Sequence, residues 1–292
     1  MLQYSSMATH AEKTQNLLHA QLEIRKLSKA TQLGEFIRNY FGSQIENRLD
    51  ITVIGHKNLE QLRGSGAFVV VGPHNGHLDT PLLRIAVEEE YKKLLFYVAA
   101  ADYWDKAVRS ENDSAQNYFR NTILTYLRRV LSPVVARIFP IDRFNSEQSD
   151  YDLEQIAQRA LNGELAVLFP EGTRSRDGNT PMSQRKFKSG IGQLILLTEG
   201  AVPIIPIYLE GNEKLMPPNT NWPELQKNGI PHRVTVHIGE PIDTFSLITK
   251  SLADMDAREI RSFRRMTADM IHGYFVGKHE DLNDKKGEVE SY

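Results

Sequence analysis

Short runs of β-branched and aromatic residues alternate with segments of helical periodicity from Ile51 onward. Continuous apolar runs of this length are typical of strands that are buried on both faces. The predicted strands are Ile51–Ile54, Ala67–Val71, Leu94–Ala99, Val135–Pro140, Leu165–Phe169, Ile204–Leu209 and Val234–Ile238. The predicted helices between them are Pro81–Lys93, Ser114–Leu131, Asp150–Asn162 and Ser189–Glu199. This alternation predicts an α/β fold with a central, largely parallel sheet flanked by helices.

The two ends of the chain have a different pattern of apolar and polar residues from this middle part. Residues 1–50 carry leucines near the helical period among polar residues, which predicts a helical N-terminal arm that packs on the main domain or contacts a membrane. We expect one domain over residues 51–245, followed by a helical segment over 246–277. The residues 278–292 are rich in Asp, Glu, Lys and Asn, which predicts a disordered tail.

Composition narrows the functional classes. The chain has 292 residues, with 35 Lys plus Arg against 37 Asp plus Glu, and this near-neutral balance argues against a dedicated nucleic-acid binder. The absence of Cys excludes disulfide frameworks, Cys-ligated zinc and thiol nucleophiles. The apolar runs are far shorter than the roughly 20 residues that span a bilayer. We therefore expect no transmembrane helix, and the N-terminal pattern predicts no signal peptide.

A first polar cluster follows the predicted strand Ala67–Val71 directly and reads Gly72-Pro73-His74-Asn75-Gly76-His77-Leu78-Asp79. The cluster therefore belongs to a strand-to-helix loop at the carboxyl end of a strand, where open α/β sheets place their ligands. On such a loop Asp79 can accept a hydrogen bond from the ring of His74. That contact would fix the tautomer of His74 and leave its other ring nitrogen to act as a base. A polar loop with an ordinary hydrogen-bonded histidine is the alternative.

A second cluster, Phe169-Pro170-Glu171-Gly172-Thr173-Arg174-Ser175, also follows an apolar strand. Between Arg174 and Lys188 there are five basic residues and one acidic residue, which predicts a local anion site in an otherwise near-neutral protein. A solvated basic loop would explain these charges but not the Pro-Glu-Gly-Thr-Arg order at the end of a strand.

Together these residues resemble the glycerolipid acyltransferase family that includes 1-acylglycerol-3-phosphate acyltransferases. The resemblance covers about residues 50–245. The motif His-x4-Asp stands as His74 to Asp79, and the motif Phe-Pro-Glu-Gly-Thr-Arg-Ser is matched in every position by Phe169 to Ser175. The remaining matches are Ile138 to Arg143, Val202 to Ile207, Phe187 to Gly190 and Ile238 to Ile242. The chain departs from the family pattern at Pro73, Gly76 and His77, which leaves the identity of the acceptor open.

The resemblance implies a glycerol-3-phosphate acyltransferase-like fold and a fatty acyl transfer from a thioester to a hydroxyl group. It implies that His74 is the general base and that Asp79 orients it. Loop amides near Asn75 and Gly76 would stabilise the thioester oxygen. It further implies an acceptor-binding role for Glu171, Gly172, Thr173, Arg174 and Lys188, with Arg143 assisting at the phosphate.

The first acceptor to consider is 1-acyl-sn-glycerol-3-phosphate, with glycerol 3-phosphate or another lysolipid as alternatives. The donor would be acyl-coenzyme A or an acyl-carrier protein, and we expect no cofactor, no metal and no nucleic-acid partner. We expect a cytoplasmic protein that is peripheral on a membrane. The segment Thr122–Phe139 mixes apolar residues with four nearby arginines, so it is either a core helix or a basic interfacial segment.

Two other classes remain open. Gly76-His77-Leu78-Asp79 resembles a loop of some zinc peptidases, which would make the protein a metal-dependent hydrolase that uses His77 and Asp79 as ligands. The chain could instead be a non-catalytic module that binds lipid or an acyl carrier. Dinucleotide and phosphate-loop motifs are absent from the sequence.

Overall fold

The computed structural model describes residues 28–62, 64–76, 78–100, 137–173, 180–215 and 223–290. The expectations for residues 1–27, for the helix Ser114–Leu131 and for Arg174 lie outside these ranges.

The described strands form one sheet with the order β1-β8-β6-β2-β5-β3-β4, and β7 pairs with β8. The strands are β1 (Leu49–Ile54), β2 (Ala67–Gly72), β3 (Leu95–Ala100), β4 (Ile138–Ile141), β5 (Leu165–Leu168), β6 (Ile204–Glu210), β7 (Gln226–Lys227) and β8 (Ile230–Ile238). From β6 to β4 all neighbouring strands are parallel, whereas β8 is antiparallel to β6. The predicted α/β fold with a largely parallel sheet is therefore confirmed.

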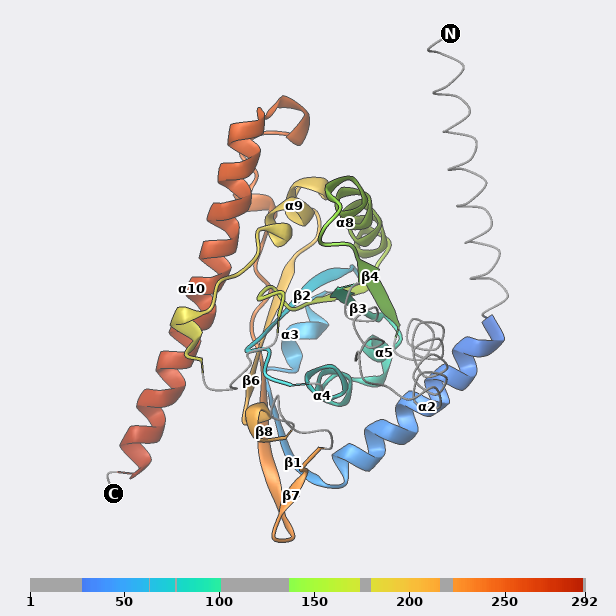
Figure 1. Ribbon diagram of the computed structural model, residues 1–292, viewed down its shortest axis with the longest axis vertical. Coiled ribbons are helices and arrows are strands. Elements are labelled where there is room, and N and C mark those ends of the chain that lie inside the picture. The colour runs from blue at the N-terminus through green and yellow to red at the C-terminus, as the bar shows by residue number, and fades with distance from the viewer. Residues whose placement is uncertain are drawn as a thin grey trace, which may run out of the picture.

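Helices cover both faces of this sheet (Figure 1). They are α2 (Ser28–Glu46), α3 (Lys57–Glu60), α4 (Asp79–Ala86), α5 (Glu89–Lys92), α8 (Ser146–Leu161), α9 (Gly190–Leu197) and α10 (Ala257–Glu290). Short 3-10 helices are η2 (Met182–Gln184), η3 (Asn212–Lys214), η4 (Phe245–Leu247) and η5 (Leu252–Asp254).

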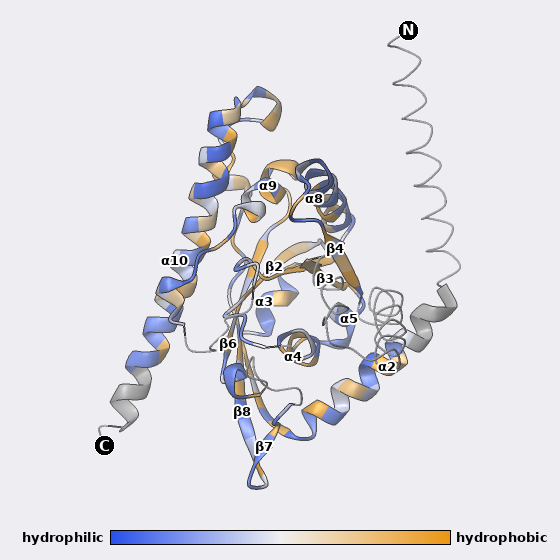
Figure 2. Ribbon diagram, in the orientation of Figure 1, coloured by the Kyte–Doolittle hydropathy of each residue, from blue (hydrophilic) through white to orange (hydrophobic). Residues whose placement is uncertain are grey.

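The alternation of side chains along β2 divides the core into two layers. Phe68 and Val70 pack with α8, α9 and α10, whereas Val69 and Val71 pack with α3, α4 and α5. All six residues of β2 are buried, as expected for a strand in the middle of a sheet that is covered on both faces. Apolar residues accordingly gather on the central strands (Figure 2), and the helices contribute buried apolar side chains to both layers.

Several predicted elements have other bounds in the structure; α8, for example, begins at Ser146 rather than at Asp150. The expected helix Pro81–Lys93 is two helices, because Val87 and Glu88 adopt extended backbone between α4 and α5. Val87 is buried in the core, so tertiary packing holds this β-branched residue in the extended form that it favours. Strand β8 begins at Ile230, before the apolar run that signalled it, because it also pairs with the short strand β7.

The C-terminal helix is longer than expected. The structure describes α10 as helical to Glu290, so the disordered tail predicted from Lys278 is wrong for the residues up to that point. The polar composition of this segment gave no sign of two contacts that it makes with the rest of the protein. Leu282 packs against the core, and the Tyr208 hydroxyl lies 2.6 Å from His279 Nδ1.

None of the helices in the described part of the chain combines the length and the apolar character that a membrane span requires.

Candidate active site

The loop between β2 and α4 brings His74 and Asp79 together. His74 Nδ1 lies 2.7 Å from Asp79 Oδ2. The side chain of Asp79 is 1% exposed and that of His74 is 18% exposed, so the carboxylate is enclosed while the ring reaches solvent. A carboxylate can only accept, so the proton of the neutral ring lies on Nδ1 and Nε2 carries a lone pair. The predicted contact between these residues therefore forms, and its geometry suits a general base.

The remaining hydrogen bonds of Asp79 hold it in this position. The backbone amides of Asn75 and Gly76 each donate to Oδ2 over 3.0 Å, and the Asn212 amide donates to Oδ1 over 2.8 Å. The expectation that the amides of Asn75 and Gly76 stabilise a thioester oxygen is therefore corrected. Asp79 takes both amides because α4 begins at this residue and turns its side chain back toward the loop.

Glu171 lies under the same loop rather than in an open binding site. Its Oε1 accepts from the backbone amide of His74 over 2.6 Å, and its Oε2 accepts from Arg185 over 2.6 Å. Both side chains of the ion pair are 6% exposed. Burial raises the pKa of the Glu171 carboxyl above its usual range, and the Arg185 guanidinium opposes that rise. With both oxygens engaged inside the protein, Glu171 positions His74 in this structure.

Phe169 gives the His74 ring an apolar support. The two ring centroids are 4.0 Å apart and the rings are inclined by 25°, which is a stacked arrangement. Phe169 directly follows β5, which pairs in parallel with β2. The carboxyl ends of these adjacent strands therefore bring the two sequence clusters into contact, as expected for an open α/β sheet.

Two cationic side chains lie next to Gly172. Arg143 donates to the Gly172 carbonyl oxygen over 2.6 Å. The stem of Lys188 lies against Gly172, where an added Cβ would be 3.2 Å from Lys188 Cγ. Gly172 also has φ +72°, a conformation that side chains rarely adopt. Thr173 and Lys188 are exposed beside it. Four of the predicted binding residues therefore gather at this edge of the sheet.

Some expectations concern residues that the structure does not describe. Arg174 and His77 lie outside the described residues, as does the part of Thr122–Phe139 before Arg137. Of that segment, Arg137 forms an ion pair with Glu164, and Phe139 packs against the core. For these two residues the structure favours the core alternative over an interfacial one.

Sequence reasoning missed two residues of the site. Arg185 was grouped with the basic residues of an anion site, but its guanidinium is buried against Glu171 and Asn75. Asn212 was not singled out at all. The one available signal was the polar Glu210-Gly211-Asn212 sequence at the carboxyl end of a buried strand, which is the same context that marked the other two clusters.

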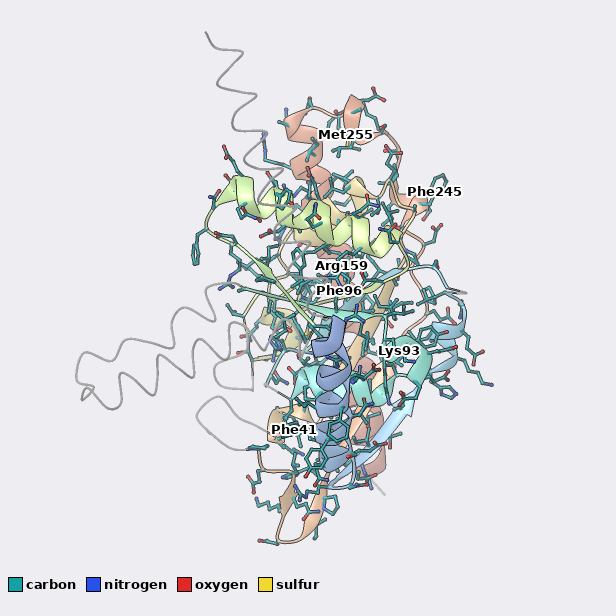
Figure 3. All side chains as sticks on the ribbon, turned by 90° about the vertical axis from the view of Figure 1, so that its right-hand side faces the viewer. Phe41, Lys93, Phe96, Arg159, Phe245 and Met255 are labelled. Carbon is teal, nitrogen blue, oxygen red and sulfur yellow. The ribbon has the colours of Figure 1, made fainter. Side chains whose placement is uncertain are left out.

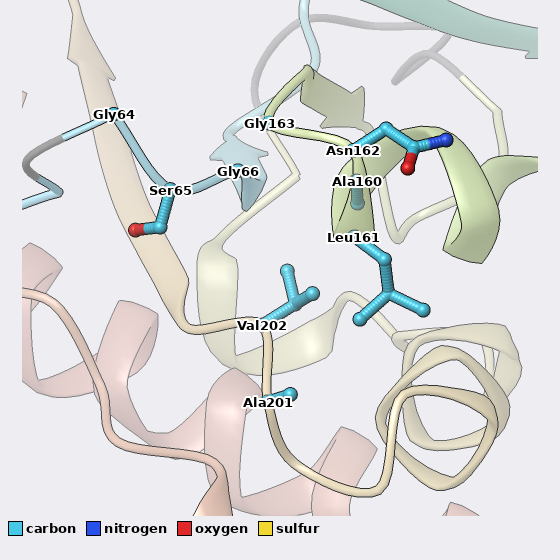
Figure 4. Close-up of a pocket in the computed structure, with 9 residues that line it drawn as sticks. All are labelled: Gly64, Ser65, Gly66, Ala160, Leu161, Asn162, Gly163, Ala201 and Val202. Atoms are coloured by element: carbon cyan, nitrogen blue, oxygen red, sulfur yellow. The ribbon is translucent and has the colours of Figure 1, made fainter.

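An open depression of about 430 Å³ lies at the opposite end of the strands (Figure 4). Its lining residues are Gly64, Ser65, Gly66, Ala160, Leu161, Asn162, Gly163, Ala201 and Val202. None of these carries a charged side chain, so the depression offers no acid, base or ion for a reaction. Among the described residues no group of three His, Asp or Glu is placed to hold a metal ion.

The chain is similar in sequence to two curated proteins. The chain is 28% identical over 205 residues to N-acylphosphatidylethanolamine synthase of Arabidopsis thaliana, covering 70% of this chain and 66% of that protein. It is 27% identical over 144 residues to 1-acyl-sn-glycerol-3-phosphate acyltransferase of Cocos nucifera, covering 49% of this chain and 39% of that protein. The chain thus spans less than two thirds of the length of each curated relative.

The chain is also similar to a solved structure and matches a family model. The 1-acyl-sn-glycerophosphate acyltransferase PlsC of Thermotoga maritima is 19% identical, with a TM-score of 0.47, over 85% of this chain and 82% of that one. The family model described as Acyltransferase matches residues 50–210, a range that contains His74, Asp79, Arg143 and Glu171. More than half of the chain fits that model, and the chain therefore belongs to the acyltransferase family.

Proposed function

We propose that this protein transfers a fatty acyl group from a thioester donor to a hydroxyl group of a glycerophosphate-type acceptor. The observation that carries the proposal is the His74–Asp79 pair, with its 2.7 Å contact and its buried carboxylate. No hydrogen-bond partner of His74 Nε2 is found among the described residues, so this nitrogen is available to a substrate hydroxyl.

The reaction requires one proton carrier and no enzyme-bound acyl group. Nε2 of His74 takes the proton of the acceptor hydroxyl while the oxygen attacks the thioester carbonyl carbon. Asp79 stabilises the imidazolium that forms, as in other hydroxyl-activating pairs. The tetrahedral intermediate then collapses, the carbon–sulfur bond breaks, and the leaving thiolate takes the proton from Nε2. The products are an ester and a free thiol, and His74 returns to its neutral state.

The cations around Gly172 support a phosphate-bearing acceptor. Arg143 and Lys188 reach the same glycine from separate elements, and their side chains supply donors suited to a phosphate. A phosphomonoester such as that of 1-acyl-sn-glycerol-3-phosphate fits this charge, and the name of the coconut relative agrees with that acceptor. Glycerol 3-phosphate and other lysolipids share the chemistry. Arg174, which belongs to the same sequence motif, stays a predicted acceptor-binding residue.

An amine acceptor is the second candidate. The Arabidopsis relative is named N-acylphosphatidylethanolamine synthase, and its alignment covers more of this chain than that of the coconut relative. The same base could deprotonate an ammonium group before the nitrogen attacks the acyl carbon. Because the described residues do not distinguish coenzyme A from an acyl-carrier protein, both belong in the assay. We also propose that the protein works peripherally at a membrane surface, where its lipid acceptors reside.

The experiment that tests the proposal measures acyl transfer by the purified chain. Labelled acyl-coenzyme A and acyl-carrier protein are offered with glycerol 3-phosphate, 1-acyl-sn-glycerol-3-phosphate, zwitterionic lysolipids and phosphatidylethanolamine in vesicles. We expect transfer to a phosphomonoester acceptor and a loss of at least about 1,000-fold in kcat for His74→Ala, within the range of general-base catalysis.

The matched control is His56→Ala, which removes an exposed histidine before α3 and should leave kcat unchanged. Transfer that prefers phosphatidylethanolamine would favour the second candidate. Binding without turnover in both the wild type and His74→Ala would contradict the enzyme and favour a lipid-binding module. Activity that a chelator abolishes would instead favour the metal-dependent hydrolase.

A further inference from the structure

Asn212 occupies a buried position directly behind the His74–Asp79 pair. It is the first residue of η3, which follows β6, the strand next to β2. Asn212 is 1% exposed. The preceding Gly211 has φ +84°, and a Cβ there would overlap the carbonyl oxygen of Arg233. The chain can therefore turn sharply at this point, and the turn directs the Asn212 side chain toward the loop that carries His74.

The amide of Asn212 makes three hydrogen bonds within this loop. Its Nδ2 donates to Asp79 Oδ1 over 2.8 Å and to the Pro73 carbonyl oxygen over 3.2 Å. Its Oδ1 accepts from Asn75 Nδ2 over 3.2 Å. All three partners lie within residues 73–79, so Asn212 links the end of β6 to the whole β2–α4 loop.

The chemistry of its neighbours fixes which way this amide points. The Asp79 carboxylate and the Pro73 carbonyl can only accept hydrogen bonds, so they require the nitrogen of Asn212. The oxygen of Asn212 must then face Asn75 Nδ2. Asn75 Oδ1 in turn accepts from Arg185 over 2.8 Å, and a guanidinium can only donate. Both amides are thus oriented by an acceptor at one end and a donor at the other.

These contacts close into a ring. Arg185 pairs with Glu171, and Glu171 accepts from the backbone amide of His74. The His74 imidazole then contacts Asp79, which closes the ring of hydrogen bonds. Its members are His74, Asp79, Asn212, Asn75, Arg185 and Glu171. Because each member has its polar group satisfied by the next, a change at one position disturbs the orientation of the others.

Asn212 has a special place in this ring. Asp79 Oδ2 receives its hydrogen bonds from His74, Asn75 and Gly76, which belong to the same loop as Asp79. Among the described residues, Asn212 gives Asp79 its one hydrogen bond from another part of the fold. The torsion of the Asp79 carboxylate, and hence the direction in which its Oδ2 faces the His74 imidazole, is therefore set by a contact from the end of β6.

We propose that Asn212 is a positioning residue for the His74 base. It holds the Asp79 carboxylate so that the His74 ring keeps its proton on Nδ1 and presents Nε2 to the acceptor. Its catalytic consequence rests on the acyl transfer proposed above, whereas its effect on the tautomer of His74 is a property of the protein alone. Without Asn212, Oδ1 of Asp79 loses its donor in a buried site, and the carboxylate rotates away from its place beside His74.

The test begins with Asn212→Ala and with Asn58→Ala as its matched control. Asn58 also joins distant segments through one amide, since its Nδ2 donates to the Ile238 carbonyl oxygen over 2.8 Å, but it is not a member of the ring. We expect kcat to fall about 100-fold in Asn212→Ala, with the KM of each substrate changed less than threefold, because misplaced catalytic groups reduce the rate by about this factor. Asn58→Ala should keep the kcat of the wild type.

The deciding readout is the tautomer of His74, measured by long-range proton–nitrogen NMR on histidine-labelled protein and assigned with His74→Ala. We expect the Nδ1–H tautomer in the wild type and in Asn58→Ala, and a mixture of tautomers in Asn212→Ala. A wild-type tautomer in Asn212→Ala would overturn the inference, whatever happens to kcat. If the wild type transfers no acyl group while the tautomers behave as expected, the proposed function fails and the positioning role stands.

Asn212→Asp supplies a nearly isosteric second variant. Its new carboxyl would face Asp79 within hydrogen-bond distance, where two carboxylates cannot both ionise without repulsion. The protonated form donates to Asp79 Oδ1 as the amide does, and the ionised form cannot. We therefore expect the kcat of this variant, relative to the wild type, to fall at least tenfold as the pH rises from 5 to 8. A ratio that is constant with pH would overturn the inference.

Discussion

Two glutamates flank β5, and each pairs with arginine, but the two ion pairs differ in burial and in what they hold. Glu164 stands just before β5 and binds Arg137 and Arg159 with its carboxylate 26% exposed. Glu171 follows β5 and binds Arg185 and the backbone amide of His74, with its carboxylate 6% exposed. The same residue types therefore serve the amino end and the carboxyl end of one strand in different ways.

The difference follows from what surrounds each pair. At the amino end Arg159 comes from α8 and lies 3.7 Å from the centroid of the Phe96 ring, so the pair joins a helix to the sheet (Figure 3). At the carboxyl end Glu171 and Arg185 both belong to the segment between β5 and α9, and they bond to His74 and Asn75 of the β2–α4 loop. A half-exposed ion pair contributes little to stability and leaves its surroundings adaptable, whereas a buried pair must be fully satisfied and fixes its neighbours. We expect the first pair to have a modest effect on stability alone, and the second to affect both stability and turnover.

Among the substitutions that compare the two ends of β5, the largest effect should come from Arg185→Met. The substitution removes the guanidinium that opposes the effect of burial on Glu171, so the pKa of Glu171 rises further and its charged form is disfavoured. The Oδ1 atom of Asn75 also loses the hydrogen bond that Arg185 donates to it. We expect kcat to fall about 100-fold and the free energy of unfolding to fall by about 3–5 kcal/mol, as measured by acyl-transfer kinetics and urea unfolding.

The matched control for Arg185→Met is Lys186→Met, which removes an exposed cation from the neighbouring position. It should change neither quantity beyond about 0.5 kcal/mol or twofold in rate. If Arg185→Met kept both the wild-type kcat and the wild-type urea midpoint, the buried pair would not control the site and the contrast with Glu164 would disappear.

An intermediate effect should come from Lys188→Ala. The ammonium of Lys188 has no ion-pair partner among the described residues, and its stem covers Gly172. We expect the KM for a phosphomonoester acceptor to rise about tenfold, the loss that corresponds to one charge-assisted hydrogen bond, with little change in kcat. Lys186→Ala is the control. An equal rise for an uncharged monoacylglycerol would remove Lys188 from the phosphate site.

The smallest effect on activity should come from Arg159→Met at the other end of β5. Glu164 keeps Arg137 as a partner, and Phe96 keeps an apolar neighbour in place of the guanidinium. We expect the free energy of unfolding to fall by about 1–2 kcal/mol, with kcat and KM within twofold of the wild type. Denaturant unfolding and acyl-transfer kinetics on the same preparation measure both. A tenfold loss of kcat would show that the amino end also positions the site.

Much of the fold was predictable because its signals are local. The strands β2, β5 and β6 are continuous apolar runs, and each was predicted within about two residues. The break between α4 and α5 was not predictable, because the burial of Val87 depends on what packs against it. The helical state of residues 278–290 was also hidden, since their composition is polar and the contacts of His279 and Leu282 are made with distant residues.

The sequence by itself determined the α/β architecture, the two loops at the carboxyl ends of adjacent strands, and the pairing of His74 with Asp79. These features depend on periodicity and on residue types only a few positions apart. Only the tertiary structure decided that Glu171 and Arg185 neutralise each other under His74, that the Asn75 and Gly76 amides belong to Asp79, and that Asn212 closes the ring. Those contacts join residues from 3 to 137 positions apart. A buried polar group takes its partner from whichever segment the packing brings near, and no local pattern in the sequence specifies that choice.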